Sequence, residues 1–274
     1  MAVIEPTDFP AFRVPRPDGA SIAVFSYGGT GARPVLLVHG AAGDHLTWRV
    51  VAPMLAAHRR VLAMDRRGHG ASGDAPGWSI ELEVADVAAV ATLIADASGA
   101  LVDVVGHSLG GRTALAASRL TPSIRRVVAY EGAPSDRPPG DLLRRLEALL
   151  ASGDLDALLA KFMTDAVGMP PDELAAFRAS PMWAQRIATG PTIVREVEAV
   201  QESPAIGADA LAAVTNPVLQ LVGSASPSWF LRGAEALDAR LAEGRVEVID
   251  GARHGAHHSH AAAFTARVEA FLDA

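Results

Sequence analysis

Short apolar runs, each ended by glycine or a polar residue, recur along this chain of 274 residues. A continuous apolar run is typical of a strand that is buried on both faces, whereas residues 21–28 (SIAVFSYG) alternate like a half-exposed strand. The runs lie within residues 34–40 (PVLLVHG), 60–70 (RVLAMDRRGHG), 101–108 (LVDVVGHS), 125–132 (RRVVAYEG), 217–222 (PVLQLV) and 245–251 (RVEVIDG).

Helical spacing of apolar residues appears between several of these runs. Residues 79–97, 108–120 and 261–272 show it, and Glu81 and Glu83 stand in the first turn of the first segment, where the helix dipole favours acids. Strands that alternate with helices predict a mostly parallel sheet covered on both faces.

One long segment, residues 135–213, breaks this alternation. It contains no convincing strand and reads as several short helices punctuated by RPPG, GMPP, SPMW and ESPA. We predict a helical lid inserted into a core domain that comprises residues 1–134 and 214–274. A separate helical domain is less favoured, because the sheet pattern resumes after the segment.

Composition narrows the classes of function. Half of the residues are hydrophobic, so a large core can form, and the net charge of −7 argues against nucleic acids and anionic membranes as partners. The absence of cysteine excludes disulfides, thiolate nucleophiles and zinc–thiolate sites. Neither a signal peptide nor an apolar stretch of membrane-spanning length is evident, so we expect a soluble, cytoplasmic protein.

The segment VVGHSLGG (residues 104–111) carries the clearest chemical signal. It lies where a predicted strand gives way to a predicted helix, which is the context of the nucleophile elbow G-x-S-x-G. Ser108 would sit on a tight turn, with glycines at 106 and 110 making room and the helix N-terminus facing a developing oxyanion. Without catalysis, the same pattern would be a glycine-rich turn.

A second loop supports this interpretation. In VLLVHGAAGDHLTW (residues 35–48), the small residues after the strand can bring the N–H of Ala41 beside that of Leu109. Two such donors would form an oxyanion hole. Taken alone, the His39-Gly40 pair is more often a structural turn.

With these segments, the chain resembles the α/β-hydrolase superfamily. The resemblance rests on HGAAGDHLTW, DRRGHGAS (residues 65–72), GHSLGG and GARHGAHHSH (residues 251–260), which occur in the family's order. It implies an α/β fold with a mostly parallel eight-stranded sheet, helices on both faces and an inserted helical lid. It also implies that His254 is the catalytic histidine. His254 and His258 have the spacing of metal ligands on a helix, but no carboxylate lies at a suggestive spacing, so we predict no metal site.

The catalytic acid is not where the resemblance places it. Family members usually carry an aspartate after the strand that here covers residues 218–222, and Ser226 stands in that region. Glu131 ends the run 127–131, and the carboxyl ends of parallel strands meet at one sheet edge, so it would emerge beside Ser108. Certain haloalkane dehalogenases and zearalenone lactonases carry a glutamate at the corresponding place.

Other assignments of the acid stay open on the sequence alone. Glu131 could cap a helix or anchor the lid instead. Asp103, inside a predicted strand, and Asp250, at the end of another, are the rival candidates.

These residues together predict a serine hydrolase with a Ser108–His254–Glu131 triad, which cleaves an ester or lactone of a small, largely apolar substrate and needs no cofactor. The serine argues against dehalogenase and epoxide hydrolase activity, which use aspartate in this fold. The alternative is a non-hydrolytic protein of the same fold: a receptor, a lyase or a cofactor-free oxygenase. We expect a small-molecule partner and leave a homodimer open. The substrate pocket is expected to include Phe162, Met182 and Trp183 of the insertion.

Overall fold

An eight-stranded sheet forms the centre of the computed structural model, which describes residues 9–135 and 140–274. The strands lie in the order β1-β2-β4-β3-β5-β6-β7-β8; β1, β2 and β4 pair antiparallel, and all other neighbours pair parallel. This confirms the predicted mostly parallel sheet. The bounds are β1 (Phe12–Pro15), β2 (Ser21–Gly28), β3 (Pro34–Val38), β4 (Arg60–Met64), β5 (Val102–His107), β6 (Ile124–Tyr130), β7 (Val218–Gly223) and β8 (Gly244–Ile249).

Strand β1 is the element of the sheet that the apolar pattern does not reveal. It is only four residues long, and it pairs with β2 through a hairpin that turns at Gly19, whose φ is 91°. The Asp18 side chain accepts a hydrogen bond from the N–H of Ala20 (3.1 Å) within this turn. The available signal was the Pro-Asp-Gly sequence between two extended segments, which is typical of a hairpin.

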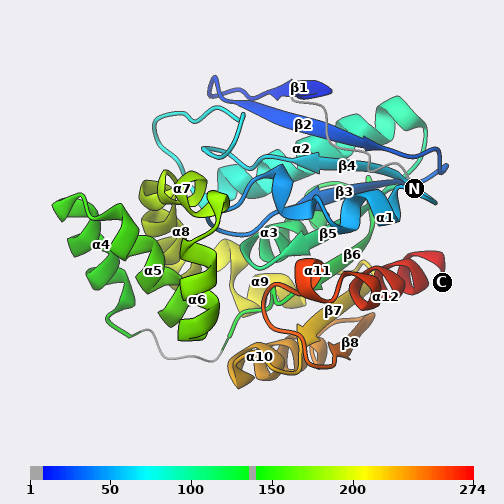
Figure 1. Cartoon of the computed structure of the whole chain (residues 1–274). Helices are drawn as coiled ribbons and strands as arrows, with labels where there is room; N and C mark the ends of the chain where they lie inside the picture. The colour runs from blue at the N-terminus through cyan, green and yellow to red at the C-terminus, as the bar shows by residue number, and fades with distance from the viewer. Residues whose placement is uncertain (1–8, 136–139) are drawn as a thin grey trace.

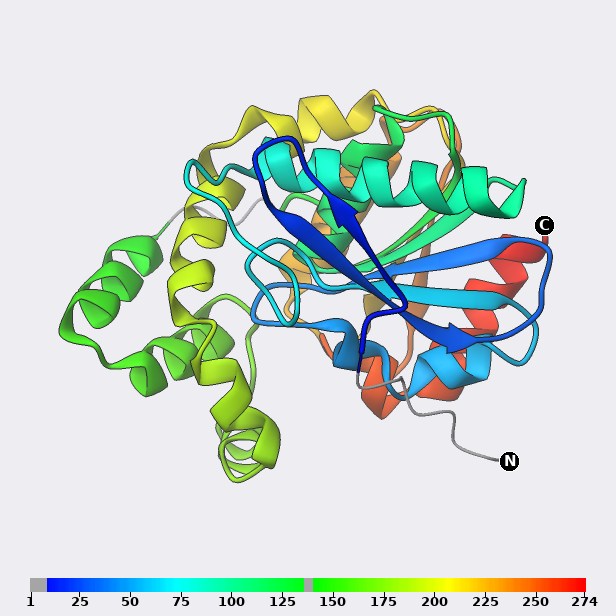
Figure 2. The same ribbon diagram turned by 90° about the horizontal axis from the view of Figure 1, so that it is seen from above.

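Helices cover both faces of the sheet, as Figure 2 shows from above. The three predicted helices are confirmed with small shifts of their ends, and further short helices complete the layers. One face carries α2 (Ile80–Ser98), α3 (Leu109–Ser118) and α10 (Ser228–Asp238); the other carries α1 (Val51–Leu55), α11 (Ala256–Ser259) and α12 (Ala261–Asp273), with the 3-10 helix η1 (His45–Trp48).

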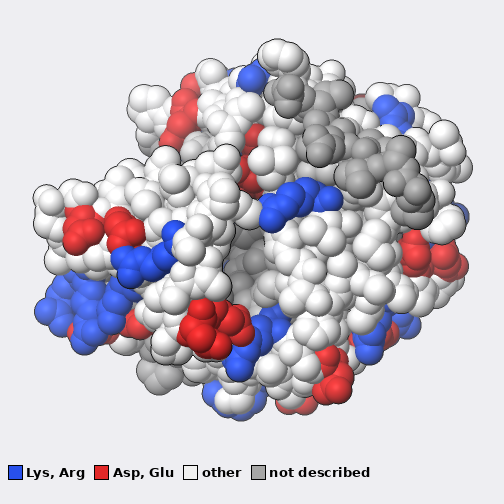
Figure 3. All heavy atoms as spheres, in the orientation of Figure 1, with Lys and Arg blue, Asp and Glu red and all other residues white. Residues whose placement is uncertain are grey.

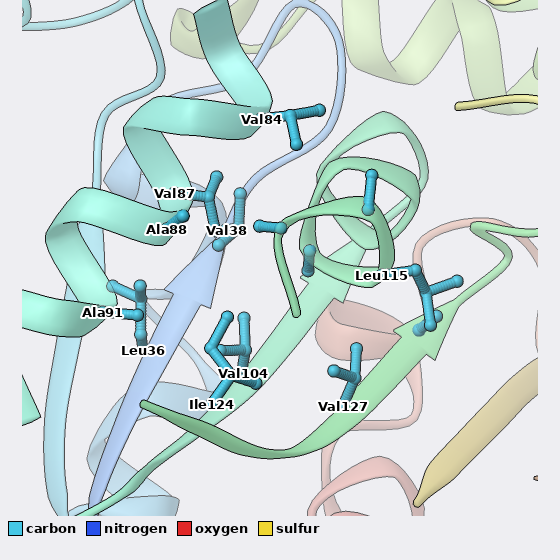
Figure 4. Packing of buried hydrophobic residues seen from close by; sticks show 14 of the residues in the cluster. Leu36, Val38, Val84, Val87, Ala88, Ala91, Val104, Leu115, Ile124 and Val127 are labelled. Atoms are coloured by element: carbon cyan, nitrogen blue, oxygen red, sulfur yellow. The ribbon is translucent and has the colours of Figure 1, made fainter. Parts of the chain in front are cut away.

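Alternate residues of the central strands feed two separate apolar clusters. Leu36 and Val38 of β3 pack toward α2 and α3, whereas Val35 and Leu37 pack toward α1 and α12, and all four side chains are fully buried. In Figure 4, Val87 and Ala88 of α2 lie beside Val38, and Ala91 lies beside Leu36. Burial on both faces explains why these strands read as continuous apolar runs.

Helices alone fill the described part of the segment between β6 and β7. They are α4 (Leu142–Ser152), α5 (Leu155–Asp165), α6 (Pro171–Arg178), α7 (Pro181–Ile187), α8 (Gly190–Glu202), the 3-10 helix η2 (Pro204–Ile206) and α9 (Ala208–Ala212). In Figure 1, α4 to α8, here called the inserted helices, project beyond one end of the sheet. They share an apolar cluster that includes Leu146, Leu158 and Ile193.

The end of the predicted lid packs differently from its beginning. Ile206 of η2 and Leu211 of α9 are fully buried in the cluster beneath α2 and α3, not among the inserted helices. The division into a core and a lid at residues 213 and 214 stays a prediction, and this packing favours an earlier boundary near η2.

Charged side chains of both signs are interspersed on the face that Figure 3 shows, and neither sign dominates it. Across the described ranges, no helix combines the length and apolar character that crossing a bilayer would require.

A buried ion cluster connects inserted helix α8 to the core. Arg66, from the loop after β4, pairs with Glu196 of α8 and with Glu83 of α2 (3.2 Å), and His69 Nε2 lies 2.8 Å from Glu196 Oε1. All four side chains are almost completely buried. Burial raises the pKa of Glu83, whereas Arg66 and His69 outweigh the effect of burial on Glu196 and lower its pKa. Buried charges need such pairing, so the cluster fixes α8 against the sheet.

Replacing Glu196 with alanine should lower the free energy of unfolding by about 3 kcal/mol, because Arg66 loses one partner of a buried ion pair. Urea unfolding measures this change. Glu198→Ala, an exposed position on the same helix, is the matched control and should stay within about 0.5 kcal/mol of the parent. Equal losses in the two variants would contradict the role given to the cluster.

Candidate active site

Ser108 occupies a strained turn between β5 and α3. Its φ of 54° and ψ of −122° are unusual for any residue with a side chain. A methyl group at Gly106 would lie 2.4 Å from the carbonyl oxygen of Gly110, and one at Gly110 would lie 2.2 Å from that of His39. Glycine is therefore required at both positions, for the steric reason that the elbow pattern predicts.

Glu131 follows β6 and reaches the predicted histidine. Its Oε2 lies 2.5 Å from Nδ1 of His254, and its Oε1 accepts a hydrogen bond from the N–H of Gly223 (2.9 Å) at the end of β7. The carboxylate is fully buried. A buried carboxylate that accepts from Nδ1 holds the imidazole in one tautomer and can stabilise its charged form.

The backbone of Glu131 is held in the left-handed region, with φ of 48°. Its N–H still donates to the carbonyl of Leu221 (2.9 Å), so the ladder between β6 and β7 continues one residue beyond the strand. A methyl group at the next residue, Gly132, would lie 3.0 Å from the backbone of Gly111. In the described part of the chain, the other non-glycine residues with positive φ are Ser108 and Ala42, which also belong to this site.

The rival acids contact other groups. Both carboxylate oxygens of Asp103 accept hydrogen bonds from the guanidinium of Arg125 (2.8 Å each). Asp250 accepts one from the hydroxyl of Ser224 (3.1 Å). The Ser226 hydroxyl is buried, and no hydrogen-bond partner for it is found within residues 9–135 and 140–274. The geometry therefore favours Glu131 over these candidates.

Three contacts position the loop that carries His254. The Nε2–H of His107 donates to the carbonyl of His254 (2.9 Å), and the hydroxyl of Tyr130 donates to the carbonyl of Arg253. The Phe230 ring stacks on the imidazole of His254, with ring centroids 4.9 Å apart. These contacts fix the imidazole between Glu131 and the cavity that it shares with Ser108.

The predicted oxyanion donors lie at the same place. Ala41 and Leu109 line a cavity together with Ser108 and His254. Within the described ranges, the N–H groups of Ala41 and Leu109 donate to no protein acceptor. Leu109 is the first residue of α3, so its N–H belongs to the positive end of that helix. Both donors are available to a ligand oxygen.

Two cavities meet at Ser108 and His254. They have volumes of about 380 and 440 Å³, and both are also lined by Ala41, Phe162 and Val167. The first continues along Arg112, Leu142, Val197, Val200, Trp229 and Phe230. The second continues along Met163, Met169, Phe177, Met182, Arg186 and His258.

The predicted substrate contacts are placed differently from one another. Phe162 lines both cavities and Met182 lines the second, whereas Trp183 lines neither. The indole N–H of Trp183 donates to Asp156 (2.7 Å), and its ring packs edge-on against Phe177, so it stabilises the inserted helices instead. The prediction that Trp183 contacts the substrate is therefore wrong. Trp229, Phe230 and Arg112 also line the first cavity, although the sequence did not single them out. The aromatic pair in the first turn of α10 was the available signal for the first two.

Histidines surrounding His254 are held in the neutral form. Burial lowers the pKa of His107 and His257 well below the usual value. Burial, with smaller contributions from Arg49 and Arg186, lowers the pKa of His258 to about 4. The rings of His107, His257 and His258 can pack against one another because they carry no charge.

The protein should therefore unfold more easily as the pH falls. In the unfolded chain histidine titrates near 6.5, so between that pH and about 4 the unfolded state binds more protons than the folded state does. The stability is complete above this window and decreases as the pH falls through it, by on the order of 1 kcal/mol per pH unit for each such histidine. Urea midpoints across this window measure it. His258→Asn should reduce the pH dependence, and the exposed His58→Asn should leave it unchanged.

Comparison with known proteins agrees with this architecture. An α/β hydrolase of known structure from Sphaerobacter thermophilus is 31% identical, with a TM-score of 0.80 over 95% of this chain and 100% of that chain. A thermophilic esterase from Thermogutta terrifontis, 24% identical, shares the fold with a TM-score of 0.75 over 96% of this chain and 98% of its own.

Curated relatives are matched over shorter stretches. Lipase LipV of Mycobacterium tuberculosis is 31% identical over 160 residues, which are 58% of this chain and 54% of LipV. Four other curated relatives are matched over 28%, 33%, 35% and 34% of their own lengths, so the chain spans about a third of these proteins. A family model described as the alpha/beta hydrolase family matches residues 35–268. The chain belongs to the α/β-hydrolase family.

Proposed function

We propose that this protein is a serine hydrolase that cleaves a carboxylic ester or lactone through an acyl-enzyme. The observation that carries the proposal is the 2.5 Å contact between Glu131 Oε2 and His254 Nδ1, beside a cavity that His254 shares with the strained Ser108. A nucleophile, a base and a buried acid in this relation are the parts that acyl transfer requires.

The tautomer of His254 defines its role. Because Nδ1–H donates to Glu131, Nε2 carries a lone pair and can take the proton of the Ser108 hydroxyl as that oxygen attacks the carbonyl carbon. The N–H groups of Ala41 and Leu109 then hold the negative oxygen. His254 next gives its proton to the leaving alcohol, and a water molecule, activated in the same way, releases the acid. No cofactor takes part.

The two cavities indicate which kind of substrate the site can hold. Ser108 and His254 line both of them, so one can hold the acyl part and the other the alcohol part of an ester, or a lactone can occupy both. Their walls are mostly apolar, which suits a small and largely hydrophobic molecule. The names of two relatives, a lipase and an esterase, support carboxylic esters as the substrate class.

Ser108→Ala should reduce the hydrolysis of p-nitrophenyl acetate by roughly 1,000-fold or more, because no other group can form the acyl-enzyme. A fluorophosphonate should add its mass to the peptide that contains Ser108 in the parent and to no peptide in the variant. Ser152→Ala, at an exposed serine, should keep both the turnover and the label. Full turnover by Ser108→Ala would refute the mechanism. A parent that is neither labelled nor active on esters would favour a receptor, a lyase or an oxygenase.

Glu131→Gln should lower kcat by roughly 10,000-fold at neutral pH. The amide oxygen of the glutamine would accept the N–H of Gly223, which leaves its NH2 group facing Nδ1 and forces the ring proton onto Nε2, where it blocks proton transfer.

Ser226→Ala is the matched control for the displaced acid, and it should change kcat by less than about threefold because the hydroxyl has no hydrogen-bond partner among the described residues. Steady-state kinetics on one p-nitrophenyl ester compares the two variants. A large loss in Ser226→Ala with little loss in Glu131→Gln would show that the acid is wrongly assigned.

A further inference from the structure

Arg112 brings a positive charge into the first cavity, one helical turn after the nucleophile. Its backbone N–H donates to the carbonyl of Ser108 (3.1 Å), and its side chain lines the cavity that contains Ser108, Glu131 and His254. Ser108 and Arg112 line one cavity, so a single ligand can contact both residues.

The charge of Arg112 is not balanced by the protein. Its Nη2 donates to the carbonyl of Ala133 (3.0 Å), and within the described residues no carboxylate forms an ion pair with it. Arg112 is partly exposed, whereas each fully or nearly buried arginine of the described ranges has a carboxylate within 4 Å: Arg59, Arg66, Arg67 and Arg186.

This lack of a partner has an electrostatic cost. Burial lowers the pKa of Arg112 to about 10. At neutral pH the group still carries its charge, and a partly buried charge without a counter-ion is unfavourable. One hydrogen bond to a carbonyl also leaves most of the five N–H donors of a guanidinium unused. The site therefore has both a charge and donors to offer to an anionic ligand.

We propose that Arg112 binds a carboxylate carried by the substrate, so that the preferred ester or lactone has an anionic arm in the first cavity. As a statement about a substrate, this rests on the proposed function. A planar carboxylate matches the fork of a guanidinium with two parallel hydrogen bonds. A monoanion fits better than a phosphate dianion, because Glu131 and Glu196 line the same cavity and a second negative charge would have no cation to meet.

The second cavity is lined by two arginines, Arg49 and Arg186, and neither is equivalent to Arg112. Arg49 is exposed to solvent, so its charge is hydrated and screened outside the cavity. The guanidinium of Arg186 donates to the carbonyl of Ala42 and to the hydroxyl of Thr47 (3.2 Å), and it lies 3.9 Å from Asp44. These contacts anchor α7 to the loop after β3, so the donors of Arg186 are already in use. The anionic arm is therefore assigned to the first cavity, and the apolar part of the substrate to the second.

The test compares two p-nitrophenyl esters of the same five-carbon diacid: mono-p-nitrophenyl glutarate, which is an anion, and its neutral methyl ester. The parent should prefer the anion in kcat/KM. Arg112→Met should lower kcat/KM for the anion by roughly 10- to 100-fold, the effect of losing charge-assisted hydrogen bonds, and change it for the neutral ester by less than about threefold. Arg112→Lys should restore part of the preference.

Arg119→Met is the matched control, because it removes the same charge at the exposed C-terminal end of the same helix. It should leave kcat/KM for both esters within about twofold of the parent. An equal loss of kcat/KM for both esters in Arg112→Met would overturn the proposal, since it would show that Arg112 only holds the Ala133 carbonyl. A parent with no preference for the anion would overturn it as well.

A binding measurement separates this proposal from the hydrolase assignment. Monomethyl glutarate should bind to Ser108→Ala in a calorimeter, and roughly 10-fold or more weakly to Ser108→Ala/Arg112→Met. This outcome supports the anion site even if the parent hydrolyses no ester and its serine resists labelling. Equal affinities in the two variants would refute the anion site even in an active hydrolase.

Discussion

The buried carboxylate of Glu131 connects the parts on which this site depends. One oxygen holds the backbone at the end of β7, and the other holds the ring of His254, which follows β8. A side chain from β6 thus fixes the relative positions of two later strand ends. Because both oxygens are fully buried, each hydrogen bond is stronger than its equivalent in water, and a lost partner would leave a buried charge unsatisfied. The geometry of the imidazole is therefore tied to the folding of the sheet itself.

Backbone strain gathers where this connection is made. Ala42, Ser108 and Glu131 adopt positive φ, which costs on the order of 1–3 kcal/mol for each residue with a side chain. The surrounding backbone can impose such conformations because chain segments contact one another directly, with no side chain between them. A methyl group at Gly223 would lie 2.3 Å from the carbonyl oxygen of Ala252, and one at Gly110 would lie even closer to the carbonyl oxygen of His39. Glycines around the site thus do more than permit turns. They let four chain segments approach closely enough to hold three strained residues in place.

The sequence predicted the sheet and the triad geometry better than it predicted the cavities, for physical reasons. Strands buried on both faces leave continuous apolar runs, and the parallel arrangement brings their ends to one edge, so Ser108, Glu131 and His254 could be placed together from order alone. Their catalytic roles remain predictions. Strand β1 has only four residues, so the sequence indicated the turn that follows it but not the strand itself. The walls of a cavity depend on which face of each helix turns inward, and the sequence does not specify this. The indole of Trp183 donates a hydrogen bond to Asp156 and lies outside the cavities, whereas the neighbouring Met182 lines one of them.

The position of the acid also determines what the β7 loop can do. Nδ1 of His254 has one proton to donate, so an aspartate after β7 and Glu131 could not both accept it. With Glu131 in that role, β7 supplies only the N–H of Gly223, and the chain turns within a few residues into α10. The first turn of that helix then brings Trp229 and Phe230 to the cavity wall, with Phe230 stacked on the imidazole of His254. A loop that no longer needs to present a carboxylate can instead exclude water from one side of the imidazole, which strengthens the interactions of the charged groups left inside.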